Sequence, residues 1–381
     1  MVSRRRVRVP RFGSSSASRY WSISAADTGP LWHRRERPRA RNASASGTAC
    51  GSSLPYADLQ TGLSLGWIEG LTYVRMRPFR FGLQIGQTSA DELRILARAA
   101  EDAGFDVVHT WDHVVEGWAP LAPLMAIADC TSRLRICPLV LNNDFHHPVH
   151  LARELASIDH LSGGRLEVGL GAGHAFTEYA AIGQRLDPPA VRKARLVEAA
   201  EILRRLLEGE EVTFSGEHYQ LHGVRTMRAR QDRVPLLIGV NGRAALAHAA
   251  RHADIIGLTM LGRTLEDGQR HEVRWAADRL DRVVEYLRVQ AGDRWAHVEL
   301  NALVQRVVIT SDRHAALREL VEQVNGLSLE DALTTPFLAI GTADEIVQHL
   351  LRCRERWGIS YFSVRDLAAF APIIDRVRRA E

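Results

Sequence analysis

The chain has 381 residues, of which 46% are hydrophobic and 25% are charged, as is ordinary for a globular protein. No run approaches the ~20 consecutive apolar residues that a membrane-spanning helix needs, so the sequence excludes a transmembrane protein. The four cysteines, Cys50, Cys130, Cys137 and Cys353, show no CxxC or other ligand spacing. The sequence therefore predicts neither a disulfide scaffold nor a zinc module, and it favours a cytoplasmic protein.

The net charge of +4 is unevenly distributed along the chain. Residues 1–75 hold twelve arginines, no lysine and four acidic residues, a net charge of +8, so the rest carries −4. That acidic body does not support a nucleic-acid-binding face. We interpret residues 1–75, which also hold twelve serines, as a disordered leader and residues 76–381 as one folded domain. The leader is a targeting segment, a nucleic-acid-binding tail or an upstream extension before a start at Met76; we favour the last.

From Phe79 onward the body alternates predicted strands with predicted helices. Eight strands followed by helices predict a (β/α)8 TIM barrel with insertions, and a doubly wound open sheet is the second choice. A hairpin insertion is predicted at 212–221. The predicted strands are 79–85, 106–110, 134–141, 166–170, 235–240, 254–258, a segment within 298–309, and 361–364. The predicted helices are 91–103, 120–130, 150–161, 191–207, 244–252, 272–290 and 343–357.

In such a barrel, ligands bind at the C-terminal ends of the strands and in the loops that follow them. Asp112 and His113 follow the second predicted strand. A histidine there can exchange a proton near neutral pH, and the neighbouring carboxylate can fix its orientation. The alternative is an ordinary polar loop.

Three further segments follow predicted strands. Gly169–Gly173 leads into His174; its glycines let a flat ligand approach the backbone, although GxGxG is not the dinucleotide-binding GxGxxG. Gly239–Arg243 opens a helix, so its N–H groups and the Arg243 guanidinium suit a phosphate; the alternative is a plain Asn-Gly turn. The histidines of 146–150 have no acidic or cysteine partner at ligand spacing, so no metal site is predicted.

Taken together, these segments resemble the luciferase-like monooxygenase superfamily, in particular its branch that uses the deazaflavin coenzyme F-420 (F420). The resemblance runs from about Phe79 to Val364 and leaves residues 1–75 uncovered. The segments that carry it are RICPLVLNNDFHHP at 135–148, LARE at 151–154, DHLSGGR at 159–165, GLGAG at 169–173 and Glu178-Tyr179.

The resemblance implies roles for individual residues. Asp112 and His113 match a catalytic pair in which the histidine lies beside the reactive ring. His174 stands where sugar-phosphate dehydrogenases of the superfamily place a catalytic glutamate. The implied cofactor-binding residues are Leu139 and Val140, a bulge behind the ring that often holds a non-prolyl cis peptide; Gly171, Gly173 and Thr177 in the loop after the fourth strand; Val240, Asn241, Gly242 and Arg243 in the phosphate turn; and Thr259 as a further phosphate neighbour.

The resemblance implies a cytoplasmic oxidoreductase that transfers a hydride between F420 and a small organic substrate. It leaves the substrate, the direction of transfer and the formation of a homodimer open. The alternatives are an FMN-dependent monooxygenase on the same barrel and a non-catalytic flavin-binding barrel. A sugar phosphate is disfavoured, because relatives use lysines near the substrate phosphate and this chain has only Lys193.

Overall fold

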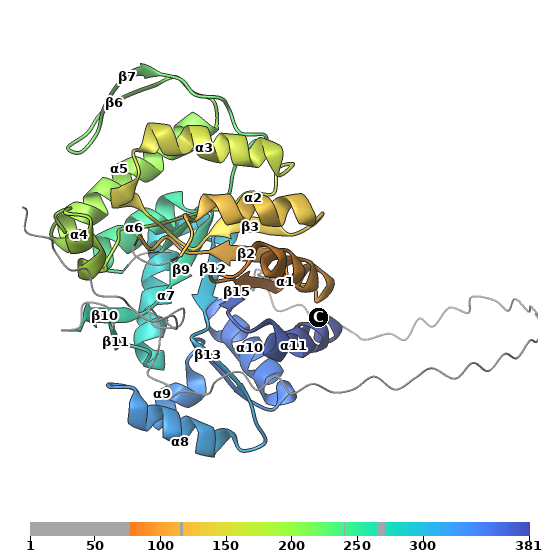
Figure 1. Ribbon diagram of the computed structural model, residues 1–381. Helices are drawn as coiled ribbons and strands as arrows, with labels where there is room; N and C mark the ends of the chain where they lie inside the picture. The colour runs from red at the N-terminus through yellow and green to blue at the C-terminus, as the bar shows by residue number, and fades with distance from the viewer. Residues whose placement is uncertain (1–76, 115–116, 240, 266–270) are drawn as a thin grey trace, which may run out of the picture. The chain divides into compact units, whose positions relative to one another are not determined.

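The computed structural model describes residues 77–381 except 115–116, 240 and 266–270. The predicted leader therefore lies outside the described residues, and so does Val240. The centre of the described chain is a parallel sheet in the order β3-β2-β1-β15-β12-β9-β8-β5-β4 (Figure 1). These strands are β1 (Arg80–Gln84), β2 (Val107–Thr110), β3 (Arg135–Pro138), β4 (Leu141–Asn142), β5 (Val168–Gly171), β8 (Leu236–Gly239), β9 (Ile255–Leu258), β12 (Glu299–Leu303) and β15 (Ile359–Val364).

The sheet closes into a barrel of eight strand positions. β3 and β4 are two halves of the third predicted strand, separated by Leu139 and Val140. β4 pairs with β5, and a parallel bridge between Ile136 and Leu166 joins β3 to the chain just before β5. The first strand also pairs with the last, β15. This closure confirms the predicted (β/α)8 barrel.

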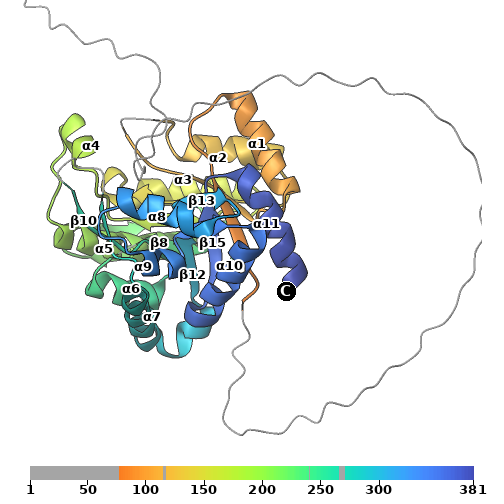
Figure 2. The same cartoon turned by 90° about the horizontal axis from the view of Figure 1, so that it is seen from below.

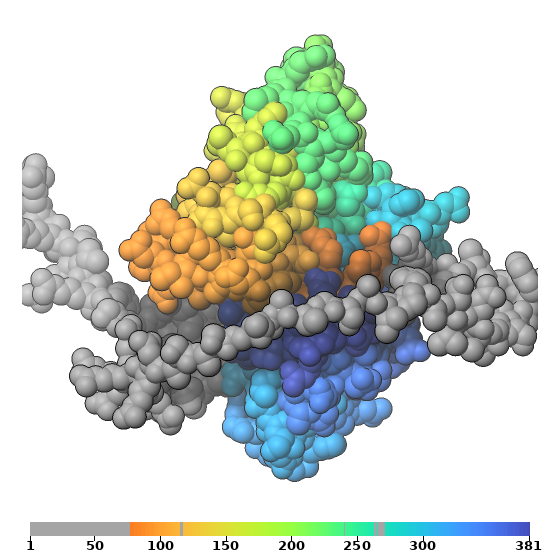
Figure 3. All heavy atoms as spheres, turned by 90° about the vertical axis from the view of Figure 1, so that its right-hand side faces the viewer, coloured from red at the N-terminus to blue at the C-terminus, as the bar shows by residue number. Residues whose placement is uncertain are grey.

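Helices surround the barrel, and most of them lie where periodicity predicted them (Figures 1 and 2). They are α1 (Ala90–Asp102), α2 (Leu121–Cys130), α3 (Pro148–Leu161), α5 (Pro189–Leu207), α6 (Arg243–His252), α7 (Ala277–Ala291), α10 (Ala343–Trp357) and α11 (Leu367–Ala380). α11 was not predicted. It packs against β1, where Phe370 contacts Phe81 and Arg378 donates to the Phe79 carbonyl. In Figure 3 the dark blue C-terminal atoms lie next to the orange atoms of the first βα units.

The prediction of one helix over 272–290 was wrong at its start. Residues His271–Val273 form strand β11, which pairs with β10 (Leu261–Thr264), and α7 begins only at Ala277. Trp275 lies between the two elements and is buried against Phe337, with ring centroids 5.4 Å apart. Burial of this large side chain fixes the turn, which the local sequence does not mark with a side-chain N-cap.

Insertions decorate the barrel between the βα units. The predicted hairpin at 212–221 is confirmed as β6 (Val212–Ser215) and β7 (Gln220–Val224). The other insertions were not predicted. They are α4 (Phe176–Ala181), the β10–β11 pair, and a parallel pair of β13 (Arg306–Ile309) and β14 (Leu338–Gly341) connected through α8 (Arg313–Gln323) and α9 (Leu329–Thr334). α4 and β10 lie on the same side of the barrel in both ribbon views (Figures 1 and 2).

Polar side chains fill much of the barrel interior. The fully buried His109 lies between the Cys137 carbonyl, 3.3 Å from Nδ1, and the hydroxyls of Tyr361 and Ser363, each 3.1 Å from Nε2. Near the N-terminal ends of the strands, Arg80 bonds buried carboxylates of β12 and of the chain before β5. Because these groups are hydrogen-bonded, they are stable in the interior. Among the described residues, no helix is long and apolar enough to cross a membrane.

Candidate functional site

A cavity of about 900 Å³ opens at the C-terminal ends of the barrel strands, where this architecture places ligand sites. Loops after β2, β4, β5, β8 and β9 contribute its walls, and α5 and the β10–β11 pair close its sides. Nine of the thirteen predicted site residues line this cavity. They are Asp112, His113, Leu139, Val140, Gly171, Gly173, His174, Asn241 and Thr259.

One wall of the cavity is the segment between β3 and β4. The peptide bond between Leu139 and Val140 is cis, as the family resemblance implied. The Leu139 backbone is held from two sides: its N–H donates to the Thr110 carbonyl at 2.7 Å, and its carbonyl accepts from Gln84 Nε2 at 3.2 Å. This fixes an apolar surface at the back of the cavity.

The glycines after β5 make room for protein atoms rather than for a ligand alone. A Cβ atom on Gly171 would lie 2.6 Å from Val140 Cγ2. A Cβ on Gly173, whose φ is +69°, would lie 2.2 Å from Tyr179 Oη. Both glycines line the cavity through their backbone, so their small size allows β4, α4 and the β5 loop to pack tightly around it.

The carboxylate that orients His113 is Glu178, not the neighbouring Asp112. His113 Nδ1 lies 2.5 Å from Glu178 Oε1, and both side chains are almost fully buried. Asp112 Oδ2 instead accepts from the Asn142 backbone N–H at 2.9 Å and lies 2.8 Å from His146 Nε2. Adjacent side chains of an extended chain project to opposite sides, which explains why the predicted pairing of Asp112 with His113 was wrong.

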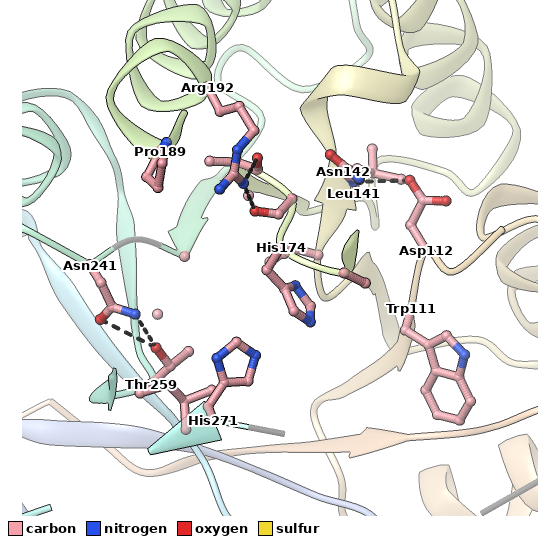
Figure 4. Close-up of a pocket in the computed structure, with 18 of the residues that line it drawn as sticks. Trp111, Asp112, Leu141, Asn142, His174, Pro189, Arg192, Asn241, Thr259 and His271 are labelled. Atoms are coloured by element: carbon pink, nitrogen blue, oxygen red, sulfur yellow. Dashed lines mark hydrogen bonds between the residues drawn. The ribbon is translucent and has the colours of Figure 1, made fainter. Parts of the chain in front are cut away.

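Three histidines converge on the cavity. The His174 ring lies 6.1 Å from the His113 ring and 5.0 Å from that of His271, centroid to centroid. Figure 4 shows His174 and His271 facing each other between the β5 loop and β11. Burial, together with His271, His113 and Arg192, lowers the pKa of His174 to about 3, so His174 is neutral at physiological pH.

The predicted phosphate turn lies at another end of the cavity. Gly242 has φ +92° and precedes α6, whose first turn has neither a side-chain N-cap bond nor an acidic residue. The first N–H groups of α6 therefore have no side-chain cap from Gly242 and no acidic neighbour in the first turn. Asn241 Nδ2 donates to Thr259 Oγ1 at 3.1 Å, which joins the ends of β8 and β9 (Figure 4). Gly242 and Arg243 line an adjoining pocket rather than the main cavity.

Lysine 193 is a site residue that sequence reasoning missed. It projects from α5 into the cavity, and a Cβ atom on Gly242 would lie 2.9 Å from its Nζ. The preceding residue, Arg192, donates to the backbone carbonyls of Ala172, at 2.9 Å, and Gly173. α5 thus brings one guanidinium to the β5 loop and one ammonium to the phosphate turn. Burial and the charge of Arg192 lower the pKa of Lys193.

The structure does not bring every predicted residue to the site. Thr177 lies in α4 and is not among the residues that line the cavity. Val240 lies outside the described residues. His271 carried no signal in the sequence, and Lys193 was noted only as a solitary lysine, since both lie on segments without a motif. Glu178 belonged to the resembling run but had no role assigned. The described residues contain no group of three His, Cys, Asp or Glu side chains arranged for a metal ion.

Comparison with known proteins gives the family. The model of the luciferase-like monooxygenase family matches residues 74–361, so this chain belongs to that family, as the sequence predicted. It is 35% identical over 187 residues to an F420-dependent glucose-6-phosphate dehydrogenase of Nakamurella multipartita, an alignment that covers 46% of this chain and 55% of the relative. It is 31% identical over 176 residues to a 5,10-methylenetetrahydromethanopterin reductase of Archaeoglobus fulgidus, with 46% and 51% covered. The chain thus spans about half the length of these curated relatives.

Solved structures share the fold. An F420-dependent secondary alcohol dehydrogenase in complex with an F420–acetone adduct superposes with a TM-score of 0.63 at 20% identity, covering 79% of this chain and all of that one. A monooxygenase from Streptomyces bottropensis superposes with a TM-score of 0.59 at 22% identity, covering 78% and 96%. These likenesses establish a luciferase-like barrel.

Proposed function

We propose that this chain is an oxidoreductase that uses F420 as a hydride carrier for a small organic substrate. The observation that carries the proposal is a cavity with an apolar wall at Leu139–Val140 that meets, at Asn241 and Thr259, the pocket containing the uncapped start of α6 at Gly242. A flavin-type cofactor needs both features, because its ring is flat and its side chain ends in a phosphate. The curated relatives named as F420-dependent favour the deazaflavin over FMN.

The residues present fit the phosphate end of such a cofactor. The first N–H groups of α6 supply hydrogen-bond donors and the positive end of the helix dipole. Lys193 adds a positive charge directly beside Gly242, and no hydrogen bond or ion pair engages its Nζ within the described residues. Glycine suits this turn because its φ is +92°, and a Cβ atom there would also lie 2.9 Å from the Lys193 ammonium group.

When bound, the deazaflavin supplies hydride transfer at its central ring. The chain's own contribution is to hold protons near that ring. Glu178 lies on the Nδ1 side of His113 and so holds a proton at that nitrogen. Because both side chains are buried, this contact also fixes the orientation of the His113 ring. His174 and His271 lie opposite, and the neutral His174 donates or accepts a hydrogen bond without adding charge.

The described cavity offers little for a second phosphate on the substrate. Its one lysine faces the cofactor phosphate turn, and Arg192 is engaged by two backbone carbonyls. Arg185 also lines the cavity and pairs with Asp187 at 3.4 Å. We therefore propose a substrate other than a sugar phosphate, although several relatives are named as glucose-6-phosphate dehydrogenases.

The test is to add F420 and FMN separately to the purified chain and to follow absorption and fluorescence. We expect the absorption and fluorescence of F420 to change when the chain is added, and those of FMN to stay unchanged. Binding of FMN alone would overturn the proposal in favour of an oxygen-activating monooxygenase, the reaction class of the Streptomyces bottropensis neighbour. Binding of F420 that is never reduced or oxidised by any of a panel of alcohols, aldehydes and imines would favour the non-catalytic barrel.

A further inference from the structure

Two amide side chains of the barrel strands line the cavity, Gln84 on β1 and Asn301 on β12. Gln84 is committed at both ends: its Nε2 donates to the Leu139 carbonyl at 3.2 Å, and its Oε1 accepts from Arg365 Nε at 2.8 Å. Asn301 is committed at one end only. Its Nδ2 donates into the barrel interior, whereas its Oδ1 accepts no hydrogen bond from any described residue. Asn301 therefore offers the cavity an unused hydrogen-bond acceptor.

The buried network around Asn301 fixes which end of its amide is left for the cavity. His109 Nδ1 lies 3.3 Å from the Cys137 carbonyl, which can only accept, so Nδ1 carries a proton. Burial lowers the pKa of His109 to about 4 and keeps the ring neutral, so Nε2 is an acceptor. Ser363 Oγ lies 3.1 Å from Nε2 and donates its single proton there.

Ser363 Oγ then has only lone pairs to offer Asn301, which lies 3.0 Å away. The Tyr361 carbonyl, 3.3 Å from the same atom of Asn301, likewise can only accept. Because both neighbours on this side are acceptors, the amide nitrogen must face them, and turning the amide round would lose both bonds. The amide oxygen is therefore the end that remains for a ligand in the cavity.

Strand order places Asn301 across the barrel from the apolar wall at Leu139–Val140. The wall lies between β3 and β4. β12 is four strand positions from each of them, past β2, β1 and β15 in one direction and past β5, β8 and β9 in the other. A flat ring that rests on the wall therefore turns its other face toward the side of the cavity that holds Asn301. A substrate must lie on that open face to exchange a hydride with the ring.

We propose that Asn301 is a specificity-determining residue whose Oδ1 accepts a hydrogen bond from a hydroxyl or N–H group of the substrate. This inference rests on the proposed function, which places the cofactor ring on the opposite wall. A donor on the substrate pairs with the amide oxygen. An ether or carbonyl oxygen of the same shape leaves two acceptors facing each other, out of reach of water. The cavity thus prefers an alcohol or amide to an analogue that can only accept.

The experiment compares three ligands of similar shape by saturation-transfer NMR. They are 1-phenylethanol, which carries a hydroxyl donor, and its methyl ether and acetophenone, which can only accept. The full chain is titrated with and without F420. Asn301→Leu replaces the amide with an apolar group of similar shape, and Ser363→Ala frees the amide to rotate. Asn143→Leu is the matched control, because Asn143 is equally buried, donates to Tyr219 Oη at 3.5 Å and does not line the cavity.

We expect the unmodified chain to bind the alcohol about three- to tenfold more tightly than the ether or the ketone, the range for one hydrogen bond between neutral groups. Asn301→Leu should abolish this preference. Ser363→Ala should reduce it, because a rotated amide can donate to the ketone. Asn143→Leu should keep it, and F420 affinity should stay within a few-fold in every variant. Melting temperatures establish that each variant is folded, and Ser363→Ala carries the test if Asn301→Leu is not.

The outcomes separate the inference from the function on which it rests. Equal affinity for the three ligands, including failure of all three to bind, overturns the role of Asn301 while F420 use stands. A preference that survives Asn301→Leu does the same. A large loss of F420 affinity in Asn301→Leu assigns the donor to the cofactor ring rather than to the substrate, and so also overturns the inference. Failure of F420 to bind the unmodified chain overturns the proposed function, and the cofactor-free titrations then decide the role of Asn301 by themselves.

Discussion

Replacing Lys193 with glutamine should weaken binding of the cofactor about tenfold at pH 7. The structure places this ammonium group beside Gly242, at the start of α6, where the cofactor phosphate is proposed to bind. A hydrogen bond to a charged group contributes ~1.5–3 kcal/mol, and Lys193 is partly exposed, so we take the lower value. About 1.4 kcal/mol corresponds to a factor of ten. Because Lys193 is the chain's only lysine, the loss has a single source.

The pH dependence of binding sharpens this test. The folded pKa of Lys193 lies below its ordinary value of 10.5, because burial and Arg192 disfavour the charged form. Affinity for the phosphate should therefore fall as the pH rises through that lowered pKa, earlier than for an ordinary lysine. Lys193→Arg should keep its affinity at alkaline pH, because a guanidinium stays charged. Fluorescence titrations of F420 between pH 7 and 10 measure both effects. A glutamine variant with unchanged affinity and an unchanged alkaline limb would refute this reasoning.

Three further predictions follow from the same geometry. Glu178→Gln should slow hydride transfer about 10- to 150-fold, the loss of one bond to a charged group, with F420 affinity within a few-fold; the exposed Glu154→Gln is the control, and equal rates would remove Glu178 from the mechanism. Gly242→Ala should weaken F420 binding more than Gly183→Ala, since both glycines have positive φ but only the Cβ at 242 meets Lys193; equal Kd values would contradict this. Burial lowers the pKa of His349 to about 4, so the unfolded chain takes up this proton at a higher pH than the folded chain does. The free energy of unfolding should therefore fall as the pH is lowered from 6.5 to 4, by at most ~3 kcal/mol. Measured by urea unfolding, it should depend less steeply on pH in His349→Gln, and an identical pH dependence would contradict this prediction.

Local sequence signals predicted the parts of the fold that local interactions determine. α10 lies where it was expected, because Thr342 and Glu345 form a capping box at its start and Gly358 ends it with φ +74°. The start of α7 was misplaced, because the turn before it depends on the burial of Trp275 against a residue 62 positions later. A contact between residues so far apart cannot be predicted from a short segment of the sequence.

The candidate site shows the same division. The turn at Gly242 and the histidine at position 113 were found because each follows a strand, and barrel topology gathers strand ends. The partner of His113 was assigned to its neighbour in sequence, whereas the structure supplies Glu178, 65 residues away. Lys193 was noted only for being a solitary lysine, and its approach to Gly242 depends on how α5 crosses the cavity. Sequence patterns did not predict these contacts between distant segments.

The pairing of His113 with Glu178 links changes in substrate specificity to changes in proton transfer. Glu178 lies on α4 and His271 on β11, both of which are insertions rather than parts of the eight repeated βα units. Insertions are the segments that diverge most readily when a barrel acquires a new substrate. In this chain such divergence would also replace the carboxylate that holds a proton at His113. A change of α4 that alters substrate specificity would therefore also alter the group that holds a proton at His113.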